Sequence, residues 1–269
     1  MSDVIPISVE WLSLREDADA RSRSRPLARK AARMTRVPVV VHDLGSGTGS
    51  MMRWLAPLLP GPQTWVLHDW NDVLLDRAAH GASDSTGHPP VIRTRVRDVG
   101  ELSDADLVGA SLVTMSALLD VLTREEAETI VRACVAAGAP ALVALSVTGR
   151  VEIEPFDPGD RVFESAFNDH QRRTTAGRAL LGPDAAATVT ELFTAAGWRV
   201  RADDSPWRLD SSETALVREW LEGWVGAAVE ERPTLEEWAE EYLRTRGAQL
   251  AAGALRVTVH HLDLLAWPP

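Results

Sequence analysis

The sequence predicts an α/β fold in which a mostly parallel sheet is covered by helices on both faces. Short β-branched runs alternate with helical patterns from Val37 onward, and this alternation is typical of parallel sheets. The run Ala141 to Val147 is apolar almost throughout, as a strand buried on both faces must be. The stretch 39–50, VVVHDLGSGTGS, leads from an apolar strand through three glycines to the start of a helix.

The elements expected after the first 36 residues follow in a regular order. Strands are predicted at 37–43, 64–69, 91–97, 111–115 and 140–147, with helices at 49–59, 71–80 and 123–137. The third strand has an arginine at every second position, which indicates an edge strand with one face in water: Arg93, Arg95 and Arg97. Its other side chains are expected to pack inward: Ile92, Thr94 and Val96.

The pattern changes after residue 150. Further elements are predicted as helices at 156–173 and between Gly182 and Gly197, a strand at 198–202 and a last apolar run at 255–265. Trp220 and Trp224 lie on one helical stripe, which indicates an inserted helical element. We therefore expect a helical cap at residues 1–36 and a main domain at 37–269, with lid segments at 150–180 and 206–250.

The net charge of −11 disfavours nucleic acid as a partner, because affinity for that polymer comes largely from Lys and Arg. The basic stretch Arg21 to Arg36 could be a phosphate-binding arm, but a solvated helix face is favoured because acidic residues share its helical pattern. No apolar run approaches the roughly 20 residues of a membrane span, and the N-terminal sequence lacks a signal pattern. We expect a cytoplasmic monomer or homodimer without membrane contact.

Cysteine and histidine usage gives no reason to expect a metal. Cys134 is the only cysteine, and its Ala-rich helical setting predicts a buried small hydrophobe. The run His260 to Asp263 is not expected to bind a metal, because adjacent residues of a strand point to opposite faces.

The glycine-rich turn predicts a nucleotide-like cofactor, because backbone amides at a helix start can approach a ligand closely. In the dinucleotide fingerprint G-x-G-x-x-G, the third glycine stands at the sixth position of the motif. Counted from Gly45, the third glycine here is Gly49 at the fifth position, and Ser50 stands at the sixth. This spacing counts against NAD as the cofactor. DLGSGTG, Asp43 to Gly49, resembles instead motif I of the class I methyltransferases that use S-adenosylmethionine (SAM). The resemblance covers about residues 37–200 and implies a Rossmann-like, seven-stranded, mostly parallel sheet.

The resemblance implies roles for this turn and for the end of the second strand. Asp43 would orient the turn and the ammonium region of the cofactor. Four residues would let the chain pass beside the cofactor: Gly45, Ser46, Gly47 and Gly49. Asp69 stands where SAM-binding and NAD-binding proteins both keep an acid for the ribose hydroxyls. Trp70 either offers adenine a flat face or is a packed tryptophan at a strand end.

Matches at the next two strands extend the resemblance. Asp98 would accept the adenine amino hydrogens, and the amide of Val99 would face the ring. Ser111 stands where the family usually has Asp, and Ser116 further along is assigned to the cofactor pocket. The signature N/D-P-P-Y/F, by which many enzymes hold a flipped base for methylation of its exocyclic amine, is absent from this stretch, so base methylation is disfavoured.

Candidate catalytic and substrate-binding residues lie mostly in the first lid segment. His170 is a candidate base or donor, and Arg172 a candidate anion clamp. Further substrate contacts are predicted at Phe167, Asn168 and Gln171. The segment could equally be a lid with a solvated outer face. Asp120, just beyond the fourth strand, is a second candidate base.

These patterns predict transfer of a methyl group from SAM to a small organic acceptor, by in-line displacement in a closed, aromatic-lined pocket. A non-catalytic SAM-binding regulatory protein is an alternative, because no single residue is chemically obligatory for this reaction. An NAD-dependent oxidoreductase is a further alternative.

Overall fold

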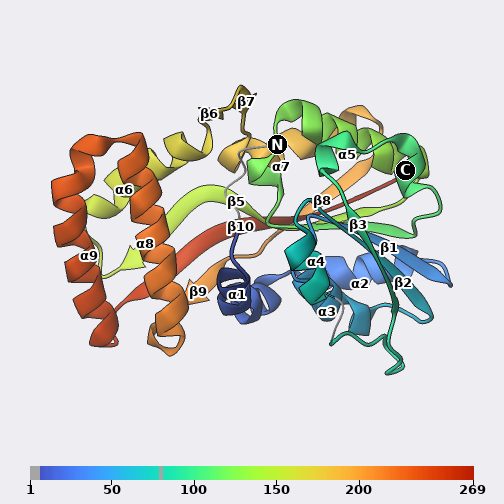
Figure 1. Ribbon diagram of the computed structural model, residues 1–269, viewed down its shortest axis with the longest axis horizontal. Helices are drawn as coiled ribbons and strands as arrows, with labels where there is room; N and C mark the ends of the chain where they lie inside the picture. The colour runs from blue at the N-terminus through green and yellow to red at the C-terminus, as the bar shows by residue number, and fades with distance from the viewer. Residues whose placement is uncertain (1–6, 79–80) are drawn as a thin grey trace.

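The computed structural model describes residues 7–78 and 81–269, which build one twisted sheet with helices around it (Figure 1). Along the sheet the strand order is β3-β2-β1-β4-β5-β10-β8, and β9 also pairs with β10. The strands are β1 Val39–Leu44, β2 Gln63–Asp69, β3 Val91–Val96, β4 Leu112–Ser116, β5 Ala141–Glu154, β8 Arg199–Asp204, β9 Trp207–Leu209 and β10 Arg256–Trp267. The first five are parallel and β10 is antiparallel to its three neighbours, so the predicted mostly parallel sheet is confirmed.

The sheet has eight strands instead of the predicted seven. The extra strand is β9, which pairs with β10 from Val257↔Leu209 to Val259↔Trp207. It forms because β5 and β10 continue as a long antiparallel pair from Ala266↔Ala141 to Arg256↔Glu154, which leaves the far half of β10 with a free edge. A separate two-stranded ribbon is made of β6 Thr174–Thr175 and β7 Arg178–Ala179.

Helices cover both faces of the sheet and its extended end. One face is covered by α2 Arg25–Met34, α3 Ser50–Leu55 and α4 Asp72–Ala78, and the other by α5 Arg124–Ala137 and α7 Ala185–Ala195. Beyond the main sheet, β5 and β10 reach a third core built with α1 Val9–Ser22, α6 Gly159–Gln171, α8 Thr214–Glu231 and α9 Glu236–Ala251 (Figure 1). Part of the predicted lid at 206–250 is therefore the strand β9.

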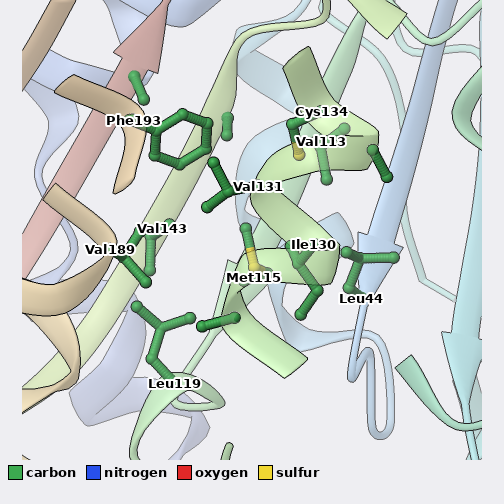
Figure 2. Close-up of a cluster of buried hydrophobic side chains, with 14 of the residues drawn as sticks. Leu44, Val113, Met115, Leu119, Ile130, Val131, Cys134, Val143, Val189 and Phe193 are labelled. Atoms are coloured by element: carbon green, nitrogen blue, oxygen red, sulfur yellow. The ribbon is translucent and has the colours of Figure 1, made fainter. Parts of the chain in front are cut away.

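The central strands place alternate side chains in two different cores. Val39 and Val41 of β1 pack with α2 and α3, whereas Leu44 packs with α5. Figure 2 shows the second of these cores, in which β1, β4 and β5 meet α5 and α7. Cys134 lies within it, fully buried, and burial raises the pKa of its thiol to about 12. The prediction of a buried small hydrophobe is confirmed.

The third strand lies at the edge of the sheet, as predicted, but its packing differs from the prediction. Ile92 is half-buried against the α3 side, whereas Thr94 and Val96 are exposed. They lie at the edge of the sheet, where β3 has only one neighbouring strand. The last two residues of the predicted helix 71–80 lie outside the described residues.

Side-chain caps stabilise the N-terminal ends of several helices. Ser8 Oγ accepts from the amide of Trp11, Ser24 Oγ accepts from that of Leu27, and Thr123 caps α5 with a capping box. These caps satisfy amides that have no partner within the first turn.

Candidate functional site

The turn after β1 runs through three glycines with left-handed backbone conformations. Gly45 has φ +64°, and a Cβ there would lie 2.7 Å from Leu118 Cδ1. Gly49 has φ +80°, and a Cβ there would lie 3.1 Å from the carbonyl oxygen of Ala78. Side chains are therefore excluded at both positions by conformation and by neighbouring atoms.

Asp69 holds this turn in place from the end of β2. Its Oδ2 accepts the amide hydrogen of Gly47 at 2.8 Å, and its Oδ1 accepts that of Asn71 at 2.9 Å. The side chain is buried, and burial raises the pKa of the Asp69 carboxyl, while its backbone hydrogen bonds lower it. The carboxylate is thus fixed in orientation and still has lone pairs for a ligand.

Asp43, at the end of β1, is more deeply buried. Its Oδ1 accepts the hydroxyl hydrogen of Thr114 at 2.6 Å, while its Oδ2 has no hydrogen-bond partner among the described residues. Burial raises the pKa of Asp43 to about 7, although Thr114 and Arg23 lower it. The carboxyl can therefore gain or lose its proton near neutral pH.

These groups open into one cavity of about 480 Å³. Seven of the residues predicted to bind a cofactor line it: Asp43, Gly45, Ser46, Gly47, Asp69, Trp70 and Ser116. It is also lined by three residues predicted for catalysis or substrate binding: Asp120, Phe167 and Gln171. The cavity spans the boundary between β1 and β4, where the strand order reverses, and ligands of open α/β sheets bind at such switch points.

Three predicted cofactor residues are not among the described residues that line the cavity. Gly49 faces the backbone of Ala78. Asp98 accepts the amide hydrogen of Gly100 with its Oδ1 and so caps the 3-10 turn Val99–Glu101. Val99 is buried in the core beside α5. Asp98 therefore serves as a turn cap and is not among the described residues that line the cavity with Asp43 and Asp69.

The predicted polar cluster of the first lid segment is split by the structure. His170 Nε2 lies 3.0 Å from Glu230 Oε2 and its Nδ1 contacts Arg173, while Asn168 Nδ2 donates to the carbonyl of Gly149 at 2.8 Å. Arg172 forms an ion pair with Asp184 near the surface. None of these three predicted residues is among the described residues that line the cavity. Phe167 and Gln171 of the same predicted cluster do line the cavity.

Arg23 contributes to the site although its sequence context gave no signal. Its guanidinium is buried and donates to Ser116 Oγ at 2.9 Å and to Ser50 Oγ at 3.0 Å. Desolvation lowers its pKa, and Asp19 counteracts this. The interpretation of Arg21 to Arg36 as a solvated helix face is therefore wrong at Arg23, which lies between α1 and α2 and points inward.

The far part of the cavity is aromatic. It is lined by Trp11 of α1, Phe167 of α6, Trp207 of β9, and Trp220 and Trp224 of α8. An aromatic lining was predicted, with Phe167 as a substrate contact. The grouping of these five rings was not predicted, because the four elements that supply them meet only in the folded chain.

Comparison with known proteins gives a match of fold. No model of a protein family and no curated protein matches the sequence. A protein from Anaeromyxobacter dehalogenans, provisionally assigned as a type II methyltransferase, matches with a TM-score of 0.54 and 14% identity over 92% of this chain and 97% of that one. The chain has a Rossmann-like methyltransferase fold.

Two other solved structures with some similarity are enzymes. The cyclopropane synthase MmaA2 from Mycobacterium tuberculosis has a TM-score of 0.47 and 13% identity over 98% of this chain and all of that one. Magnesium protoporphyrin IX methyltransferase from Synechocystis PCC 6803 has a TM-score of 0.45 and 16% identity over 76% of this chain and 83% of that one.

Within the described part of this methyltransferase fold, no helix is long and apolar enough to cross a bilayer. Across residues 7–78 and 81–269, no group of three or more His, Cys, Asp or Glu side chains is arranged to hold a metal ion.

Proposed function

We propose that the protein transfers a methyl group from SAM to a small organic acceptor in the cavity described above. The observation that carries this proposal is the turn Gly45 to Gly49, held by the Asp69 carboxylate and opening into the same cavity as Asp43 and Trp70. The methyltransferase fold supports it, because the turn lies at the switch point of that fold.

The buried polar atoms at this end of the cavity fit such a cofactor. Asp43 Oδ2 and Ser46 Oγ are buried and have no hydrogen-bond partner among the described residues. Leaving such groups unpaired is costly, so a ligand that supplies partners is favoured. Asp43 would face the ammonium, Asp69 the ribose hydroxyls and Trp70 the adenine.

SAM supplies an activated methyl group, whose bond to sulfur breaks as the bond to the acceptor forms. The chain chiefly aligns the two reactants and excludes water, and positioning of this kind contributes about 7–11 kcal/mol. When the acceptor is a hydroxyl or an ammonium, Asp120 takes its proton. Asp120 lines the cavity, and burial raises the pKa of its carboxyl, which makes it a stronger base than an exposed aspartate.

We also propose that the cap at residues 1–36 and the lids at 150–180 and 206–250 close the cavity. Trp11 of the cap and Phe167, Trp220 and Trp224 of the lids line it. A small-molecule acceptor suits a cavity of about 480 Å³, and the net charge of −11 argues against nucleic acid. We propose further that the protein acts in the cytoplasm as a monomer or homodimer.

The test is calorimetric titration with S-adenosylhomocysteine (SAH), SAM and NAD, followed by detection of SAH release with a panel of acceptors. SAM and SAH should bind, and Asp69→Ala should weaken SAH binding about 5- to 150-fold, which corresponds to about 1–3 kcal/mol. The matched control is Asp76→Ala, exposed on α4, which should leave affinity unchanged. Binding of NAD but not SAM would overturn the proposal, and tight SAM binding without turnover on any acceptor would indicate a regulatory protein.

A further inference from the structure

The cavity has two chemically different halves, and the strand order separates them. Proceeding along the sheet from β2 through β1 and β4, its lining includes Asp69, Asp43, the glycine turn and Ser116. Beyond β4, the lining combines residues of β5 and β10, such as Leu145, Val147 and Val259, with aromatic rings supplied by α1, α6, α8 and β9. If the cofactor occupies the first half, as the proposed function requires, the second half is where the acceptor binds.

The aromatic half presents flat surfaces in fixed positions. The rings of Trp220 and Trp224 are stacked, with centroids 5.3 Å apart and an interplanar angle of 18°. Phe167 lies 6.5 Å from Trp224 between ring centroids. Both helices that carry these rings are packed into the third core. Rigid aromatic walls of this kind favour a planar ring over a flexible chain.

Four buried polar atoms in this half have no hydrogen-bond partner among the described residues: Trp224 Nε1, Gln171 Oε1, His260 Nε2 and His261 Nδ1. Two other buried tryptophans show the usual outcome, because Trp65 Nε1 donates to Gln63 at 2.8 Å and Trp207 Nε1 donates to Asp19 at 3.0 Å. Trp224 and His261 are 2% and 4% exposed, so bulk water does not satisfy them.

The arginines that line this half have partners within the protein. Arg15 forms an ion pair with Asp19 at 3.0 Å and lies over the ring of Trp207. Arg178 forms an ion pair with Glu126 at 2.7 Å. His261 is neutral, because burial lowers its pKa to about 3. The unused binding capacity is therefore neutral hydrogen bonding, with a donor at Trp224 and an acceptor at Gln171.

We propose that the methyl acceptor is a neutral, planar aromatic molecule whose edge carries a hydroxyl or ring N–H and a separate hydrogen-bond acceptor. Its ring lies among Phe167, Trp220 and Trp224, its accepting atom receives the N–H of Trp224, and its donor reaches the amide oxygen of Gln171. This inference rests on the proposed methyl transfer for the assignment of the two halves of the cavity.

The test is titration of the full chain, with and without saturating SAH, using three matched probes. These are 6-hydroxyquinoline, which is neutral, planar and carries both a donor and an acceptor, 1-naphthoate, which is planar but charged, and 2-decalol, which is neutral but saturated. The hydroxyquinoline should bind at least about fivefold more tightly than either of the others. Equal or tighter binding of the naphthoate or the decalol would overturn the proposal.

Two variants test whether the hydroxyquinoline binds in the aromatic half of the cavity. Trp224→Phe keeps a ring but removes the N–H, and it should weaken hydroxyquinoline binding about fivefold while leaving SAH affinity unchanged. Trp238→Phe is the matched control, because Trp238 on α9 is partly exposed and is not among the described residues that line the cavity. Unchanged hydroxyquinoline affinity in Trp224→Phe would overturn the proposal. Binding that depends on Trp224 in a protein that fails to bind SAM and SAH would instead overturn only the proposed methyl transfer.

Discussion

The carboxylate of Asp69 accepts the amide hydrogen of Gly47 at 2.8 Å, and this bond joins the end of β2 to the turn that follows β1. Residues 22 positions apart in sequence are thereby fixed to one another at the mouth of the cavity. Asp69 acts on the conformation of the turn as well as offering lone pairs to a ligand, so the shape of the turn and its proposed binding chemistry depend on the same side chain.

Gly45→Ala should destabilise the protein more than a substitution at an unhindered glycine. Gly45 has φ +64° and a Cβ there meets Leu118, whereas Gly138 has φ +62° with no atom within 4 Å of the added Cβ. Gly138→Ala should cost about 1 kcal/mol for the left-handed conformation alone, and Gly45→Ala about 2–3 kcal/mol. Urea unfolding measures both, and equal losses would show that Leu118 moves aside freely.

Asp43→Asn should stabilise the ligand-free protein at pH 8. The folded pKa of Asp43, about 7, is above its ordinary value of 3.8, so its ionisation costs stability as pH rises from about 4 through 7. Removing that charge should raise the free energy of unfolding by up to about 4 kcal/mol at pH 8 and have little effect at pH 4. Thermal unfolding at the two pH values checks this, and a variant that is less stable at pH 8 would contradict it.

SAH affinity should rise with pH in the wild type and lose that dependence in Asp43→Asn. A cationic ammonium favours the ionised carboxylate, and a group with a pKa of about 7 is mostly neutral at pH 6 and mostly ionised at pH 8. Affinity should therefore increase about tenfold over that range. Calorimetry at both values is the measurement, with Asp76→Asn as control; a flat profile in the wild type would place the ammonium elsewhere.

Mild acid should destabilise the protein through two neighbouring histidines. His42 Nδ1 lies 3.0 Å from His68 Nε2, and burial lowers their pKa values to about 4 and about 3, below the ordinary value of 6.5. Their neutral forms contribute stability above pH 6.5 that is lost as pH falls toward 4, at most about 2 kcal/mol each by pH 5. Urea unfolding at pH 7 and pH 5 should show a smaller loss for His68→Gln than for the wild type or for His88→Gln, whose side chain is exposed.

Arg23→Met should loosen the contact between the cap and the glycine turn. The substitution leaves Ser50 and Ser116 without their guanidinium donor, and we expect a loss of about 1–3 kcal/mol in unfolding free energy together with weaker SAH binding. Arg29→Met, at an exposed position of α2, is the control. Wild-type SAH affinity in Arg23→Met would show that the cap acts only on stability.

Local patterns were sufficient where a residue's role depends on its own strand or turn. The apolar run of β5 and the spacing of the glycines predicted a buried strand and a tight turn, because both depend on side chains within a few positions. Asp98 shows the limit of this reasoning. An acid after a strand can reach a ligand or cap the next turn, and Asp98 caps Gly100.

The sequence by itself determined the parallel sheet, the glycine turn and the acids at the ends of β1 and β2, because strand periodicity and backbone conformation are local properties. Only the tertiary structure decided that β9 joins the sheet, that Arg23 points inward, that His170 contacts Glu230, and that five tryptophans line one cavity. Each of these depends on contacts between segments tens to hundreds of residues apart. Such contacts are set by the packing of three cores, which no local pattern specifies.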